Sequence, residues 1–105
     1  MREQGSFSER CYSLLRQVPR GKVTTYQALA NALGTKAYQA VGNAMNKNPY
    51  APKVPCHRVV KSGGNIGGFA HGSRKKKKML EAEGIKFDGD SIRNFRNVLF
   101  DSFRA

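Results

Sequence analysis

Two short helical patterns separated by a single glycine constrain the fold of this chain most. Thr24-Thr25-Tyr26-Gln27 fits a capping box, which predicts a helix that continues through Leu33 and ends at Gly34. Thr35 can cap a second helix over residues 36–47. The apolar side of this second helix consists of Ala37, Ala40, Val41, Ala44 and Met45, and its polar side of Gln39, Asn43, Asn46 and Lys47. The pattern predicts a helix-turn-helix motif with a donor-rich outer face.

A further helical pattern precedes this motif. Ser6-Phe7-Ser8-Glu9 also fits a capping box, and the helix that it begins is expected to stop near Pro19. The apolar positions of this helix recur at helical spacing and are Phe7, Cys11, Leu14, Leu15 and Val18. Because Cys11 lies on the apolar stripe, we interpret it as a small buried core residue.

The chain after the motif predicts a small β-hairpin wing. Val59-Val60 has the composition of a strand, Ser62-Gly63-Gly64-Asn65 is typical of a turn, and Ile66 begins a return strand. The glycine-rich residues 67–72 lack the order G-x-G-x-x-G, so we do not interpret them as a nucleotide-binding loop.

Helical signals return towards the C-terminus. The basic run 74–78 leads into a helix that we expect to end at Gly84, residues 85–87 are compatible with a short strand, and Ser91 can cap a last helix. The apolar stripe of this last helix is Ile92, Phe95, Val98 or Leu99, and Phe103. Together the elements predict a mainly α fold, a winged helix-turn-helix with a small β-hairpin wing and a C-terminal helix, in one domain over residues 1–105.

The charge distribution indicates a polyanionic partner. The chain has a net charge of +12, and residues 10–78 carry 14 Lys or Arg and no Asp or Glu. A surface of this sign attracts phosphate backbones, because binding releases condensed counterions. A ribosomal or chromatin-type protein would have a similar charge, so the charge indicates nucleic acid but no activity. The cations of residues 74–78 are either solvated or paired with a phosphate. No helix combines basic with large apolar residues, which makes membrane binding the weaker interpretation.

The cysteines and histidines give no sign of a metal site or a disulfide. Cys11, Cys56, His57 and His71 show no pair at the spacing of zinc ligands, and a disulfide is not expected in a cytosolic chain. The sequence has no apolar run that could span a membrane and begins without the apolar core of a signal peptide. We therefore expect a cytoplasmic, nucleoid-associated monomer that uses no metal and no cofactor.

Pro55-Cys56-His57-Arg58 is the segment best suited to covalent chemistry. A thiol reacts as its thiolate and therefore needs a nearby base. His57 is the obvious base, but adjacent residues of a strand point to opposite faces, so contact needs a turn or a bridging water. Pro55 favours such a turn. The imidazole in turn needs an orienting carboxylate, for which Glu83 is a candidate. These residues favour a nucleophilic cysteine over a structural one without defining its substrate.

Four segments together resemble the O6-alkylguanine-DNA alkyltransferases, also called methylated-DNA–protein-cysteine methyltransferases. The sequence Pro-Cys-His-Arg-Val-Val at residues 55–60 is similar to the family's active-site sequence, and residues 21–30 are similar to its first helix-turn-helix segment. Residues 40–49 resemble its recognition helix and asparagine hinge, and residues 67–84 its active-site loop and the following helix. The likeness runs in order from about residue 5 to 87 and does not include the family's usual N-terminal domain.

The resemblance implies a repair protein that binds double-stranded DNA through the minor groove and rotates a damaged guanine out of the helix. The alkyl group then moves from O6 of the guanine to Cys56, once per molecule. In this scheme His57 takes the thiol proton through a water, Glu83 orients His57, and Asn48 braces the active-site turn. The expected base pocket is lined by Tyr26, Val59, Phe69 and Ala70. The expected contacts to DNA come from Thr25, Lys36, Gln39, Asn43, Lys47 and Arg58.

Three residues depart from the family pattern. Gln39 stands where the family usually has an arginine that fills the space left by the rotated base, and we expect slower base flipping as a result. Phe69 stands where a hydroxylated aromatic residue is common, and Ala70 where a serine often bonds to O6. Loss of these donors is expected to reduce transition-state stabilisation.

Two alternatives stay open beside the transferase. An alkyltransferase-like protein binds alkylated DNA without transfer and signals other repair machinery, but such proteins generally replace the acceptor cysteine, commonly by tryptophan, whereas Cys56 is present here. A winged-helix regulator would bind DNA with an inert Cys56, but it has no reason to place Pro-Cys-His-Arg beside its wing. We therefore favour the transferase.

Overall fold

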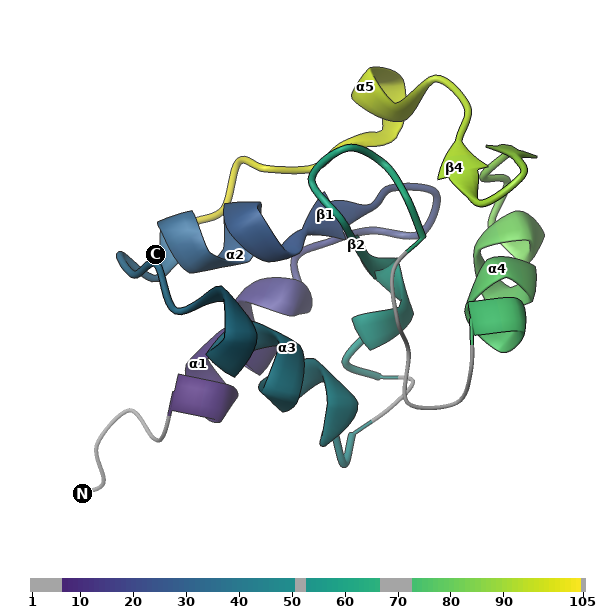
Figure 1. The fold of residues 1–105 in the computed structure, drawn as a ribbon. Coiled ribbons are helices and arrows are strands. Elements are labelled where there is room, and N and C mark those ends of the chain that lie inside the picture. Colours follow the sequence, from purple (N-terminus) through teal and green to yellow (C-terminus); the bar gives the residue numbers. More distant parts are fainter. Residues whose placement is uncertain (1–6, 51–52, 67–72, 105) are drawn as a thin grey trace.

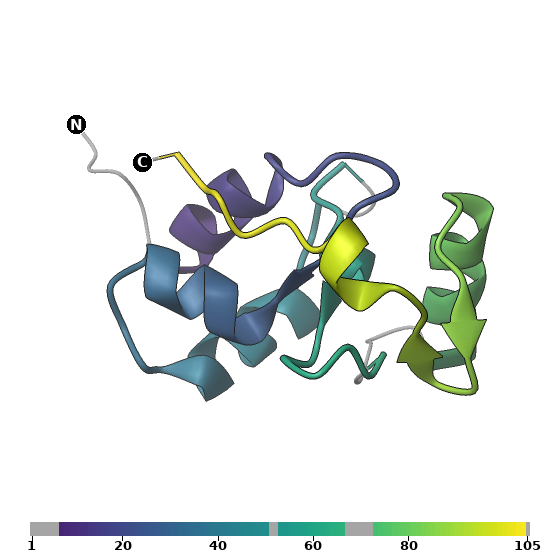
Figure 2. The same ribbon diagram turned by 90° about the horizontal axis from the view of Figure 1, so that it is seen from above.

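The computed structural model describes residues 7–50, 53–66 and 73–104 of the chain. Its elements in chain order are α1 (Phe7–Leu15), β1 (Thr24–Thr25), α2 (Tyr26–Ala32), α3 (Tyr38–Asn46), the 3₁₀ helix η1 (Cys56–Arg58), β2 (Val59–Val60), α4 (Ser73–Ala82), β3 (Phe87–Asp88), β4 (Ser91–Ile92) and α5 (Phe95–Val98). In Figures 1 and 2, α1, α2 and α3 lie on one side of the molecule and α4 on the other, with η1 and β2 between them. The prediction of a mainly α fold is confirmed. Over the described ranges, no helix has the length and apolar character that a membrane crossing requires.

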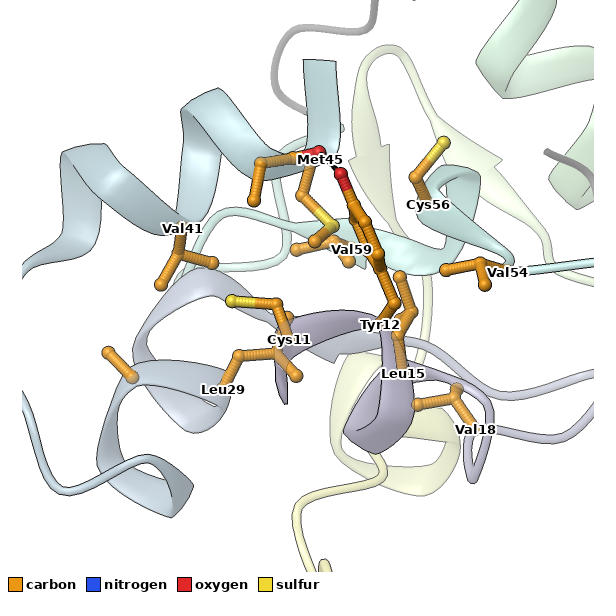
Figure 3. Packing of buried hydrophobic residues seen from close by; sticks show 12 residues of the cluster. Cys11, Tyr12, Leu15, Val18, Leu29, Val41, Met45, Val54, Cys56 and Val59 are labelled. Atoms are coloured by element: carbon orange, nitrogen blue, oxygen red, sulfur yellow. Dashed lines mark hydrogen bonds between the residues drawn. The ribbon is translucent and has the colours of Figure 1, made fainter. Parts of the chain in front are cut away.

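The first three helices form a bundle around an apolar core, which Figure 3 shows from close by. The predicted stripe of α1 is buried at Cys11 and Leu15. The Tyr12 hydroxyl donates a hydrogen bond to the Ala44 carbonyl (2.8 Å) and ties α1 to α3. The predicted apolar side of α3 is buried at Val41, Ala44 and Met45, whereas Ala40 is half-buried and Ala37, which precedes the helix, is exposed. Its predicted polar side is exposed at Gln39, Asn43, Asn46 and Lys47.

Both helices of the predicted helix-turn-helix motif are present, with shifted starts. The cap of α2 is Thr25, whose hydroxyl accepts a hydrogen bond from the Ala28 amide (2.9 Å), rather than Thr24. Both threonines belong to β1, and Thr25, the last residue of the strand, also caps the helix. The predicted helix over 36–47 begins only at Tyr38, and ahead of it the Thr35 hydroxyl accepts a hydrogen bond from the Ala37 amide (3.1 Å).

The predicted wing is only partly correct. The turn exists, since the Lys61 amide donates to the Asn65 carbonyl (2.9 Å). However, β2 pairs in parallel with β1, with Thr24 opposite Val59, so the strand is buried against the bundle. Ile66, where the return strand was expected to begin, donates its amide to the Asp90 carbonyl (2.8 Å), and Asn65 also forms a bridge with Ser91. The antiparallel hairpin of the described residues is β3–β4, further along the chain.

The predicted C-terminal helix is present only as the short α5, and its predicted start at Ser91 is wrong. Ser91 belongs to β4, and α5 spans only Phe95–Val98 behind Asn94, which has a positive φ of 57°. The apolar residues of this segment serve two separate clusters, which one straight helix cannot reach. Ile92 is buried beside Leu80 and Val60, whereas Phe103 packs against the helical bundle. In Figure 2 the last residues accordingly run from α5 back over the bundle.

Candidate active site at Cys56

Cys56 lies where the helical bundle meets the rest of the molecule. Pro55 precedes η1, and the Arg58 amide donates to the Pro55 carbonyl (2.9 Å) to close one tight turn. The predicted turn is therefore confirmed, and Cys56 and His57 do not alternate as they would on a strand. Cys56 is 6% exposed and belongs to the core cluster, and in Figure 3 its sulfur points away from the other labelled side chains.

The imidazole of His57 is held by Glu83. Its Nε2 lies 2.8 Å from Oε2 of Glu83, and both side chains are almost completely buried. With Nε2–H donating to the carboxylate, Nδ1 carries the lone pair that can accept a proton. Burial lowers the pKa of His57, with contributions from Arg58 and Lys76, and outweighs the opposing effect of the Glu83 carboxylate. A neutral imidazole at neutral pH is the form that a base requires.

Arg58 completes this network from the same turn. Its Nε and Nη2 donate to the two oxygens of Glu83 (2.9 and 2.8 Å), and its Nη1 donates to the Val18 carbonyl (2.8 Å). Burial acts to raise the pKa of Glu83, but the hydrogen bonds and charges of Arg58 and His57 outweigh it and hold the pKa below its usual value. Glu83 is therefore an ionised anchor. In the structure the guanidinium of Arg58, which was expected to contact DNA, is bound to Glu83 and to the Val18 carbonyl.

Lys76 is the residue that sequence reasoning missed. Its side chain is 0% exposed, although it belongs to the run of cations interpreted as solvated or phosphate-bound. Its Nζ lies 5.9 Å from the centre of the Tyr26 ring, within the range of a cation–π interaction. Burial lowers the pKa of Lys76 from 10.5 to about 8, against an opposing contribution from Cys56, so the ammonium and the thiol are close enough to interact.

Helical spacing contained the signal for Lys76. Lys76, Leu80 and Glu83 recur at i, i+4 and i+7, which places them along one side of a helix. Leu80 is buried and Glu83 binds His57, so the lysine on the same side had to face inward. Of the same run, Arg74, Lys75 and Lys78 are exposed, and for them both interpretations of the charge still apply.

Asn48 fixes the chain that leads to the active-site turn. Its Nδ2 donates to the Val54 carbonyl (2.7 Å), and its Oδ1 accepts from the Tyr50 amide (2.9 Å). The geometry thus connects the end of α3 to the residue before Pro55, which is the bracing position expected from the sequence.

The expected pocket residues lie around the turn as far as the structure describes them. Tyr26 begins α2 half-buried, and its pKa is raised by burial and by the nearby Cys56. Val59 is buried in β2 directly after the turn. Phe69 and Ala70 lie outside the described residues.

The expected DNA contacts divide into two groups. Lys36, Gln39, Asn43 and Lys47 are exposed on or next to α3, where a ligand can reach them. Thr25 differs, because its side chain is buried and caps α2, so its hydroxyl is not available at the surface. Within the described ranges, no three His, Cys, Asp or Glu side chains gather as metal ligands would.

A known protein family, several of its members and several solved structures are similar to this chain. The family model described as 6-O-methylguanine DNA methyltransferase, DNA binding domain, matches residues 6–85. A methylated-DNA–protein-cysteine methyltransferase of Metallosphaera sedula is 44% identical over 88 residues, which cover 84% of this chain and 55% of that protein. The chain spans about half the length of the curated relatives it matches.

Two solved structures have folds similar to that of this chain. The O6-methylguanine-DNA methyltransferase of Pyrococcus kodakaraensis matches with a TM-score of 0.70 and 47% identity, over 78% of this chain and 48% of that one. The structure of S. pombe Atl1 with damaged DNA containing O6-carboxymethylguanine matches with a TM-score of 0.78 and 28% identity, over 97% of this chain and 100% of that one. The matches confirm the expected fold class, a small helical domain of the helix-turn-helix type.

Proposed function

Because this chain belongs to the 6-O-methylguanine DNA methyltransferase family, we propose that it repairs O6-alkylguanine in double-stranded DNA by moving the alkyl group to Cys56. One observation carries the proposal: Cys56 precedes a histidine whose Nε2 is bound to a buried carboxylate at 2.8 Å. This arrangement supplies a thiol, a neutral base and an anion that orients the base.

In the proposed reaction, the thiol proton passes through a water to Nδ1 of His57, and Glu83 stabilises the imidazolium that forms. The thiolate Sγ attacks the alkyl carbon, so that an S–C bond forms while the C–O6 bond breaks and its electron pair stays on the guanine. The guanine takes up one proton, which balances the one released by the thiol. The product thioether is stable, so each molecule acts once.

The neighbouring residues receive supporting roles in this proposal. Tyr26 lines the pocket that receives the base, and the backbone of Val59 contacts the base edge. Asn48 holds the approach to the turn through its bond to Val54. Phe69 and Ala70 stay assigned to the pocket on the sequence resemblance alone.

We further propose that a monomer binds the DNA minor groove with the exposed side of α3. Base flipping costs a few kcal/mol, which contacts to phosphates must offset. The exposed Lys36 and Lys47 flank that helix and supply positive charge. Affinity for DNA should therefore fall steeply as the salt concentration rises.

The proposal is tested on the DNA substrate. A duplex with a single O6-methylguanine is mixed with increasing amounts of protein, and the remaining methylated base is quantified after digestion to nucleosides. We expect the methylated base to disappear in a one-to-one ratio with added protein. Persistence of the methylated base at excess protein would refute transfer.

A second candidate function is that of a damage sensor, which binds alkylated DNA and leaves it unchanged. The match to Atl1 over its whole length favours it, since the transferases match over about half of their length. Lesion-selective binding with no loss of the methylated base would establish this candidate.

A further inference from the structure

An open cavity of about 410 Å³ lies between the two helices of the motif and the turn after β2. The residues that line it come from three parts of the chain and are Tyr26, Gln27, Tyr38, Lys61 and Ser62. Its wall thus combines two aromatic rings with a cation, an amide and a hydroxyl. A nucleotide offers the matching groups, a flat base for a ring and a phosphate for a cation.

Tyr38 is the unusual member of this wall. It is 42% exposed, one of two large hydrophobic side chains that are exposed in the described part of the chain. The other, Tyr50, is occupied: its ring contacts Tyr12 edge-on at 5.6 Å, and its hydroxyl donates to Glu9 (3.0 Å). Among the described residues, the side chain of Tyr38 takes part in no such hydrogen bond or ring contact. An aromatic ring held at the rim of a cavity without a partner is suited to stack on a ligand.

The cavity is connected to the active site through Tyr26. This residue lines the cavity and also lies near Cys56 and beneath the Lys76 ammonium. Lys61 follows β2 directly, only two residues after Val59. A DNA strand that delivers one base to Cys56 can therefore place its next nucleotide against Tyr38 and Lys61.

We propose that this cavity receives the nucleotide adjacent to the rotated guanine, with Tyr38 stacked on its base and Lys61 paired with its phosphate. The inference rests on the proposed function, because it requires a base to be brought to Cys56. It adds a residue that stacks on DNA next to Gln39, whose side-chain amide carries no positive charge. In this role Tyr38 stabilises the DNA conformation in which the guanine is rotated out of the helix. It therefore affects the binding of DNA but not of an isolated base.

The experiment measures binding of a fluorescent duplex containing one O6-methylguanine, in a Cys56→Ala background so that transfer cannot consume the lesion. Tyr38→Ala is expected to weaken this binding about tenfold, in the range of a single base–aromatic stacking contact. Tyr38→Phe, which keeps the ring, should bind as the parent does. Tyr50→Ala serves as the matched control, because it removes an equally exposed tyrosine outside the cavity.

Two further measurements separate stacking from folding and from the chemistry. Because Tyr38 is at the surface, all its variants should unfold at the temperature of the parent. With Cys56 restored, Tyr38→Ala should transfer alkyl groups from free O6-benzylguanine at the parental rate. Lys61→Met should weaken duplex binding and reduce the salt dependence of the affinity by about one phosphate contact.

Equal binding by the parent and by Tyr38→Ala would overturn the inference while leaving the proposed function intact. Equal loss in Tyr38→Phe and Tyr38→Ala would overturn it too, since the hydroxyl and not the ring would then be responsible. A parent protein that binds methylated and unmethylated duplexes alike would overturn the proposed function, and this inference with it.

Discussion

Cys11 and Cys56 belong to the same core cluster, yet their surroundings differ in kind. Cys11 is completely buried inside the bundle, and burial raises the pKa of its thiol to about 11. Cys56 starts a 3₁₀ turn at the edge of the bundle, next to His57 and close enough to Tyr26 and Lys76 to interact with them. Burial alone therefore does not decide what a cysteine does.

The difference follows from which elements surround each sulfur. Around Cys11 the helices α1 to α3 contribute apolar side chains, which give rigidity and no charge. Around Cys56 the turn contributes His57 and Arg58, while Lys76 on α4 and Glu83 just after it contribute further charges. A reactive thiol is expected at such a junction, because charged groups are costly inside a closed apolar core.

The largest expected effect comes from the two cysteines themselves. Cys56→Ala should abolish alkyl transfer and leave lesion binding in place, because only the acceptor sulfur is lost. Cys11→Ala should transfer at the parental rate but lower the free energy of unfolding by about 1–2 kcal/mol, since it leaves a small void in the core. Transfer rates from a methylated duplex and urea unfolding test both. Transfer that survives in Cys56→Ala, or that disappears in a folded Cys11→Ala, would contradict the comparison.

Glu83→Gln is the next largest change. It should slow transfer about 100-fold, at the lower end of the range for general acid–base catalysis. Because Glu83 normally raises the pKa of His57, its loss should also move the acidic limb of the rate profile to lower pH, which a purely structural role would not do.

The same substitution should also destabilise the fold. Removing one member of a buried ion pair costs about 3 kcal/mol, because the other charge is left without its partner. Asp88→Asn is the control, since it breaks the Asp88–Arg93 pair, in which both side chains are largely exposed, and should have no measurable effect on urea unfolding. Equal stability of the two variants would show that the Glu83 network is not a buried anchor.

Lys76 makes the stability of the fold depend on pH. Its pKa is about 8 in the folded state and 10.5 as an unperturbed group, so between these values the unfolded chain binds more protons and stability rises with pH. From pH 8 to pH 9 the free energy of unfolding should rise by on the order of 1 kcal/mol. Above pH 9, Cys11 acts in the opposite direction, because its pKa is raised by folding.

Urea unfolding of the parent, of Lys76→Met and of Lys78→Met at the two pH values checks this expectation. The rise should disappear in Lys76→Met, which removes the titrating group, and should persist in the exposed control Lys78→Met. The same rise in all three proteins would refute burial of the lysine as its cause.

The smallest expected effect comes from the exposed side of α3 and not from the residues around Cys56. Gln39→Arg adds a cation to the exposed side of α3 and should moderately speed repair of a methylated duplex, while leaving transfer from free O6-benzylguanine unchanged. Single-turnover rates on the two substrates measure the difference. An equal change on both would mean that position 39 acts on the chemistry and not through DNA.

The sequence predicted the bundle better than the junction, and the reason is physical. Helical spacing and the glycine at position 34 define α1 to α3, because each helix needs only local signals and one apolar side. The partnership of His57 with Glu83 was also predictable, since the sequence offers few acids to choose from. Lys76 was not, because a cation within a run of cations is expected at the surface unless its helical side is considered.

Pairings between distant segments were the other source of error. The strand β2 was expected in a hairpin with the residues that follow it, but it pairs with β1, which lies 35 residues earlier by the Thr24–Val59 register. A helix capped by Ser91 is predicted because the apolar residues from Ile92 to Phe103 have helical spacing. These residues instead pack in two separate apolar clusters, which the chain connects by an extended path. Neither choice can be made from local propensity alone.

The most direct test of the central claim is a peptide map of the protein after it has met an excess of methylated duplex. We expect the peptide with Cys56 to gain the mass of one methyl group in place of a hydrogen, and the peptide with Cys11 to stay unchanged. An unmodified Cys56 in a protein that still binds the lesion selectively would contradict the claim and leave the sensor as the function.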